Sequence, residues 1–219
     1  MKRLWWGVAI ALAAFTWGAS AWAYPNLPDS IPIHWNIHGQ VDGWGSRASV
    51  FLMPGVATGL LVLFAFLPAL SPKSFEVDSF RPTYLYILAV TVGLFAFIQV
   101  VILAATFQEI RGERWVDIGR ALVAGIFVFF GLMGNVMGKV RKNFYIGIRV
   151  PWTLASDRVW NDTHRLAAWL MVGGSVVGLA LVLLGAPLPA AFGVLLGVAL
   201  APIVYSFLRY KSLERRGAL

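Results

Sequence analysis

Cysteine is absent from the 219 residues, and acidic residues are scarce, with 10 Asp and Glu against 18 Lys and Arg. The lack of cysteine excludes disulfides and thiolate chemistry, although it does not identify a compartment. Charged residues make up only 13% of the chain and apolar residues 59%, which is more apolar surface than a soluble domain can bury. The composition therefore predicts an integral membrane protein.

Six continuously apolar runs are long enough to cross a bilayer, whose core of about 30 Å needs roughly 20 residues of helix. Strands of a membrane barrel would be shorter and would alternate, so we predict an all-α integral membrane protein with six transmembrane helices. The runs cover residues 4–24, 50–70, 83–107, 117–138, 164–185 and 187–208. The first run also has the three regions of a cleavable signal peptide, but its length and terminal aromatic residues favour a retained helix.

Basic residues are distributed unevenly between the two ends of these helices, with 14 at one end and 4 at the other. Cytoplasmic loops carry the excess of Lys and Arg, so we expect both chain termini in the cytoplasm. The net charge of +8 then reflects topology and contact with the lipid bilayer. We expect no nucleic-acid partner, because no basic soluble domain is present.

The first long polar loop, residues 25–49, lies on the expected outer side. Apolar and polar residues alternate from Ile31 to His38, which predicts an extended segment with one apolar face. About 13 Å would separate His34 from His38 on a strand, so a shared metal ion would require the loop to curl. We expect no metal site and interpret four side chains as ligand-contacting residues: His34, Asn36, His38 and Asp42.

The second long polar loop, residues 139–165, lies on the expected cytoplasmic side. Apolar and polar residues alternate from Phe144 to Val150, and Ser156 has the character of an N-cap for the helix that follows. Before the loop, an amide on a glycine-rich helix face needs a polar partner near the membrane interior. The predicted functional residues of this region are Asn135, Asn143, Arg149, Trp152, Trp160, His164 and Arg165.

The loops divide the chain into an N-terminal membrane domain (1–80), a third helix with a short outer loop (81–116) and a C-terminal membrane domain (117–219). One helix, a long loop and two helices occur twice in opposite orientation, which is the layout of a 3+3 inverted repeat. Two Gly-x-x-x-Gly patterns, at 174–178 and 193–197, indicate tight helix contacts within the bundle or between the subunits of an oligomer.

Two stretches resemble a known family. The sequence of residues 143–170, NFYIGIRVPWTLASDRVWNDTHRLAAWL, is similar to the signature of the SdpI family, the immunity proteins for the sporulation-delaying toxin. Residues 27–43 resemble the uncharacterised domain that precedes it in that family. The resemblance implies a multi-pass protein of the bacterial plasma (inner) membrane. It also implies immunity to a peptide toxin outside and signalling through a transcriptional repressor inside.

Three functions follow from these observations. An immunity protein or membrane signalling receptor needs no catalysis and agrees with polar chemistry concentrated in the two loops. A transporter or exporter of small molecules or peptides is favoured by the repeated layout, but no charged residue lies centrally in an apolar run, where coupled transport requires one. A metal-dependent membrane enzyme ranks third, because neither a His-Glu-x-x-His nor a Gly-x-Ser-x-Gly motif occurs. We therefore predict no enzyme activity, no catalytic residues and no cofactor.

Overall fold

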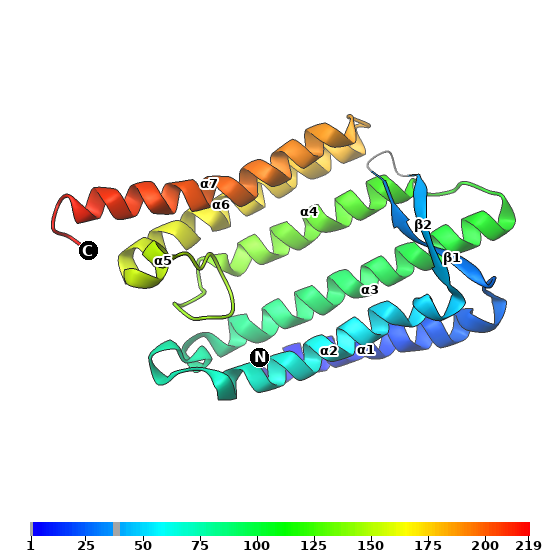
Figure 1. Ribbon diagram of the computed structural model, residues 1–219, viewed down its shortest axis with the longest axis horizontal. Helices are drawn as coiled ribbons and strands as arrows, with labels where there is room; N and C mark the ends of the chain where they lie inside the picture. Colours follow the sequence, from blue (N-terminus) through cyan, green and yellow to red (C-terminus); the bar gives the residue numbers. More distant parts are fainter. Residues whose placement is uncertain (1, 37–39) are drawn as a thin grey trace.

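The computed structural model describes residues 2–36 and 40–219. Within these residues, six helices are long and apolar enough to cross a membrane, and they run side by side (Figure 1). The helices are α1 (Lys2–Ala23), α2 (Leu52–Phe66), α3 (Arg81–Arg111), α4 (Ile118–Met137), α6 (Asp157–Leu183) and α7 (Leu188–Glu214), and a short α5 (Pro151–Ala155) precedes α6. The predicted helical membrane fold is confirmed.

The α2 helix alone, with 15 residues, is too short for a bilayer core. Turns of 3-10 helix continue it at both ends, Arg47–Phe51 before it and Leu67–Leu70 after it. The combined segment has 24 residues and therefore reaches the length that a membrane span requires.

Both chain termini lie at one end of the molecule, together with α5 and the segment that joins α4 to it (Figure 1). A β hairpin lies at the opposite end. An even number of crossings brings both termini to the same side, so the two polar loops lie at opposite ends as expected. The end that holds the hairpin is called outer below and the other end inner, in accordance with the prediction from the basic residues.

The two halves of the bundle have different packing orders. In the first half α3 packs against both α1 and α2, whereas in the second half α6 packs against both α4 and α7; α3 and α4 join the halves (Figure 1). The central helix is therefore α3, the third of its half, in the first half and α6, the second of its half, in the second. This difference gives the inverted repeat no support, and the repeat stays a prediction, as does the three-part division of the chain.

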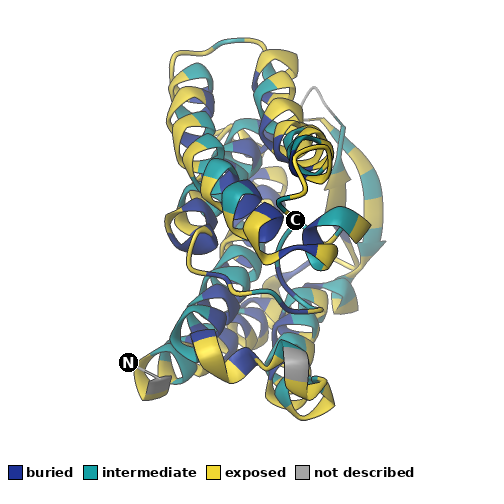
Figure 2. Ribbon diagram, turned by 90° about the vertical axis from the view of Figure 1, so that its left-hand side faces the viewer, coloured by how far each residue is buried: buried dark blue, intermediate teal, exposed yellow. Residues whose placement is uncertain are grey.

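Buried residues face the interior of the bundle, and exposed residues lie on its outward faces (Figure 2). Many of the exposed residues are large and apolar, such as Trp169 at 75% exposure and Leu184 at 84%. Water would make such surfaces costly, whereas lipid tails solvate them. The distribution is therefore that of a protein whose outer surface contacts hydrocarbon.

Glycine allows α4 and α6 to approach closely. A Cβ added at Gly134 would lie 2.7 Å from Cβ of Met171 and 3.0 Å from the backbone nitrogen of Val172. The absence of a side chain at Gly134 therefore permits the close packing of α6 on α4. Gly174 and Gly178 likewise pack within the bundle, against α7 and α4. A Cβ on Gly193 or Gly197 would meet nothing within 4 Å, so a subunit contact there stays a prediction.

The outer loop forms an antiparallel hairpin of β1 (Ser30–Trp35) and β2 (Val41–Ser46). The extended conformation was predicted, but the regular alternation was wrong: Ile31 is buried and Ile33 is 41% exposed. Pro32 pairs with Trp44 and His34 with Gly43, so Ile33 is an extra residue of β1; Trp35 then pairs with Val41, which leaves Asp42 as an extra residue of β2. A bulge shifts the faces of the residues that follow it, which explains the difference.

Candidate functional site

Asn143 organises the inner loop from a fully buried position. Its Nδ2 donates to the carbonyls of Arg141 (2.8 Å) and Ile146 (3.0 Å), and its Oδ1 accepts from the backbone N–H groups of Tyr145 and Ile146, both at 2.7 Å. These bonds use both donors and both lone pairs of the amide. The predicted site residue Asn143 therefore shapes the loop from within.

The loop is consequently not the alternating extended segment that was predicted. No strand forms between 139 and 150, which all lie in the described part of the chain. Phe144, expected on the same face as Ile146, is 40% exposed, whereas Ile146 is buried. The Asn143 side chain turns the backbone here, and such local side-chain bonding competes with regular strand structure.

Trp160 and His164 lie one turn apart on α6, fully buried, and their rings stack with centroids 4.0 Å apart and planes at 21°. The indole Nε1 of Trp160 donates to the carbonyl of Val140 at 2.8 Å. His164 Nδ1 lies 2.8 Å from the carbonyl of Trp160, and Nε2 accepts from the backbone N–H of Ile148 at 2.9 Å. This set of partners selects the neutral imidazole with its proton on Nδ1.

Gly147 is the loop residue whose backbone lies directly against this aromatic pair. Its φ is +110°, and a Cβ there would lie 2.3 Å from Nε2 of His164 and 3.3 Å from Trp160. Both the backbone angle and the contact exclude a side chain. Gly147 was not among the predicted site residues, although a glycine inside a run of apolar and aromatic residues was the available signal.

Two polar contacts attach the short α5 and the start of α6 to α7. Trp152 Nε1 donates to Ser206 Oγ at 2.5 Å, and Arg209 Nε donates to Asp162 Oδ2 at 2.8 Å. Ser156 caps α6, accepting from the backbone N–H of Val159 at 3.4 Å, which confirms its predicted role. The predicted functional residue Trp152 is thus half-buried against α7.

The remaining predicted residues of the inner region are exposed. The Arg149 guanidinium contacts the carbonyl of Phe144 and otherwise faces outward, and Arg165 is exposed on α6. Asn135 is exposed rather than inside the helix interface, with its side chain in reach of the Tyr86 hydroxyl of α3. The inner region therefore separates into residues that order the loop and residues that are open to a partner.

The outer hairpin brings His34 and Asp42 together, with Nδ1 of His34 2.5 Å from Oδ1 of Asp42, and both side chains are exposed. Asn36 bonds with Gln40 across the turn: its Nδ2 donates to Gln40 Oε1 at 3.2 Å, and its Oδ1 accepts from the Gln40 N–H at 3.1 Å. His38 lies outside the described residues. Among the described residues no three His, Asp or Glu side chains gather as metal ligands would.

A cleft of about 290 Å³ lies between the hairpin and the outer end of α3. Sequence reasoning missed this cleft, because it joins segments that are distant in the chain and combines few conspicuous residue types. The half-exposed side chain of Trp44 gives the cleft an aromatic ring, and Glu109 gives it a carboxylate. The lining residues are Pro28, Ser30, Pro32, Trp44, Thr106, Glu109 and Ile110.

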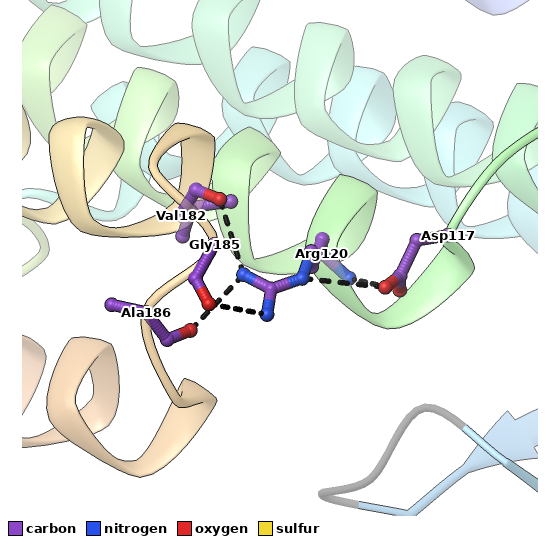
Figure 3. Close-up of polar contacts among 5 residues, drawn as sticks. All are labelled: Asp117, Arg120, Val182, Gly185 and Ala186. Carbon is purple, nitrogen blue, oxygen red and sulfur yellow. Dashed lines mark hydrogen bonds and ion pairs between the residues drawn. The ribbon is translucent and has the colours of Figure 1, made fainter.

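Arg120, counted above only as a topology signal, connects the start of α4 to the turn between α6 and α7 (Figure 3). Its Nη1 donates to the carbonyls of Val182 (3.1 Å) and Ala186 (3.0 Å), and its Nη2 donates to that of Gly185 (3.1 Å). Asp117 pairs with the guanidinium at 3.4 Å and also caps α4 by accepting from the Arg120 N–H at 2.9 Å. One side chain thus bonds to three carbonyls around the C-terminus of α6, of which that of Val182 also accepts from the N–H of Gly185 at 3.3 Å.

Two segments of the chain match families of known proteins. Residues 139–206 match the SdpI/YfhL protein family. The resemblance to the SdpI family is confirmed. Residues 11–58, from α1 through the hairpin to α2, match a domain of unknown function, DUF1648.

One curated relative extends the SdpI-family match along most of the chain. Over 165 residues the chain is 26% identical to the immunity protein SdpI of Bacillus subtilis (strain 168), and the alignment covers 75% of each protein. No solved structure matches the chain. Together with the six apolar helices, the similarity indicates a multi-pass membrane protein related to an immunity protein rather than to an enzyme.

Proposed function

We propose that this SdpI-family protein protects a bacterial cell from a membrane-active peptide and that its hairpin cleft binds the peptide at the outer surface of the plasma membrane. The cleft carries this proposal. It is a concave site of about 290 Å³ that combines an aromatic ring with a carboxylate, which is the composition of a binding site.

The surroundings of the cleft suit an amphipathic peptide. Ile33, Trp44 and Ile110 expose 41%, 51% and 49% of their surfaces at this end of the molecule. A peptide that inserts into membranes carries apolar surface, which these residues would cover in place of lipid. Binding here would hold the peptide at the membrane surface and keep it from depolarising the bilayer.

A second role, signalling through a cytoplasmic partner, is supported by the inner region. Arg141, Arg149, Arg158 and Arg165 are exposed there, and none of them forms an ion pair within residues 2–36 and 40–219. Such a surface would attract an acidic partner, of which a transcriptional repressor held at the membrane is one form. Transport has less support, because the halves differ in packing order.

The test is the membrane potential of toxin-sensitive bacteria exposed to the sporulation-delaying toxin, with and without this protein. We expect expression to preserve the potential. Trp44→Ala should require about tenfold less toxin for the same depolarisation, because a central Trp is typical of binding hot spots. Trp22→Ala, which removes a more exposed indole from α1, is the matched control and should protect fully. Equal depolarisation with and without the protein would refute the proposal.

The same assay separates the outer residues from the inner ones. Arg149→Ala should impair function while leaving abundance and membrane insertion unchanged, because its guanidinium is exposed and contacts only a loop carbonyl. His34→Ala tests the contact between His34 and Asp42, neither of which is a lining residue of the cleft. Reduced abundance of the Arg149 variant would instead identify Arg149 as a structural residue.

A further inference from the structure

We infer that the hairpin cleft selects a cationic group, a guanidinium or an amine carried by the peptide on an apolar stem. This inference rests on the proposed function and names the chemistry that the cleft recognises. Its basis is a carboxylate that forms no ion pair among the described residues, placed in the same cleft as an accessible indole.

Glu109 supplies the negative charge. It lies in the last turn of α3, its side chain is exposed, and it forms no ion pair within the described residues. Of the basic residues at the outer end, Arg47 pairs with Asp29 at 2.9 Å, Arg120 pairs with Asp117 at 3.4 Å and Arg111 lies over the ring of Trp115. Arg114 is exposed in the loop after α3 and forms no ion pair within the described residues. The carboxylate is therefore available to an incoming cation.

The end of α3 adds to this negative potential. The helix stops at Arg111 beside the cleft, and its C-terminal carbonyls carry the negative end of the helix dipole. The N–H of Gly112 reaches the carbonyls of Gln108 and Glu109, and the N–H of Glu113 reaches that of Gln108 at 3.2 Å. The Gln108 side chain does not compete for a ligand, because its Oε1 already accepts from the backbone N–H groups of Trp115 and Val116.

Trp44 supplies the second recognition element. It pairs across the hairpin with Pro32 and stands between Gly43 and Gly45, so no neighbouring side chain in β2 shields the indole. The face of an indole attracts a cation. Pro28 and Pro32 form rigid apolar walls, which suit the methylene stem of a Lys or Arg side chain.

Fluorine NMR of the whole protein tests this inference directly. The protein would carry 5-fluorotryptophan in nanodiscs of phosphatidylglycerol, a lipid without an amine, and the Trp44 signal would be assigned from Trp44→Phe. The probe is n-butylguanidinium, compared with n-butylurea, which has the same shape and no charge. We expect a saturable shift of the Trp44 signal with the cation and none with the urea. An equal saturable shift with both probes would overturn the inference.

Two variants distinguish the contribution of the Glu109 carboxylate from that of other negative charges on the protein surface. Glu109→Gln should weaken binding of n-butylguanidinium about fivefold or more, because it removes the charge and keeps the shape of the side chain. Glu113→Gln, in the loop after α3 and outside the cleft, is the matched control and should bind as the original protein does. Equal affinity of the Glu109 variant and the original protein would refute the role of the carboxylate.

The source of the cation is tested with lipid composition and toxin. If added phosphatidylethanolamine abolishes the shift, a lipid amine occupies the cleft and the assignment to a peptide is wrong. If Trp44→Ala loses protection against the toxin while Glu109→Gln keeps it, the cationic preference is wrong and the proposed function stands. If n-butylguanidinium binds as expected but no variant alters protection, the cleft chemistry stands and the proposed function is wrong.

Discussion

Gly147 is the residue on which the order of the inner loop most depends. Its backbone adopts φ +110°, and it lies directly against the imidazole of His164. Gly147→Ala should lower the free energy of unfolding by at least about 2 kcal/mol, because the backbone angle is strained for any side chain and the Cβ overlaps Nε2. Titration with sodium dodecyl sulfate in lipid micelles would measure the loss.

Gly138→Ala provides the control at the end of α4. Its φ is −67°, and an added Cβ would only touch Ala168 at 4.0 Å. This variant should unfold at the same detergent concentration as the original protein or at a slightly higher one. A Gly147→Ala protein with unchanged stability would show that the loop can move away from His164 at little cost.

Residues of the inner region were predictable only where their partners are local. Ser156 was identified as an N-cap because its acceptor role involves a backbone group three residues away. The roles of Trp160 and His164 depend instead on Val140 and Ile148, whose positions the fold determines. Sequence selected these residues as important, but it could not show that they face inward while Arg149 and Arg165 face outward.

At the scale of elements, Arg120 joins the start of α4 to the end of α6 and to the turn that precedes α7. Its guanidinium bonds to three carbonyls in the turn from α6 to α7. Arg120→Ala should destabilise the protein by about 2 kcal/mol, since hydrogen bonds from a charged donor contribute more than neutral ones and three such bonds are lost. Hydrogen exchange of the amides at 183–188 should accelerate, which mass spectrometry would detect.

Arg114→Ala is the comparison for this prediction, because it removes an exposed arginine from the loop just before α4. It should leave both stability and hydrogen exchange unchanged. Arg120→Lys should recover only part of the loss, because a single ammonium cannot reproduce the fork that reaches three carbonyls. Full recovery with lysine would indicate that charge, and not geometry, stabilises the turn.

Elements inside the membrane were predicted well and elements outside it less well. Hydrocarbon requires continuous helices with apolar side chains, so composition alone located all six spans. In the loops, alternation of apolar and polar residues predicted two regular extended segments. The hairpin contains two register irregularities, at Ile33 and at Asp42, and the Asn143 side chain replaces the other segment with a turn. A periodic pattern registers neither an unmatched residue in a hairpin nor the local hydrogen bonds of a side chain.

At the scale of the whole molecule, the orientation in the membrane is testable because the chain has no cysteine. A single cysteine at exposed Ser46 in the hairpin should react in intact cells with a thiol reagent that cannot cross the membrane. A cysteine at exposed Asn161, near the inner end of α6, should react only after the cells are lysed. Labelling of Asn161→Cys and not Ser46→Cys in intact cells would reverse the predicted topology.

The contacts that close the second half of the bundle have an implication for its synthesis. At the inner end, Val140 and Ile148 leave the ribosome before Trp160 and His164, to which they bond. At the opposite end, Arg120 is synthesised long before the carbonyls at 182–186 that it will bind. Each early segment must therefore wait for a later one. A chain interrupted before α6 would lack both sets of contacts. It would present quality-control proteases with an open loop at one end and, at the other, an arginine without its carbonyl partners.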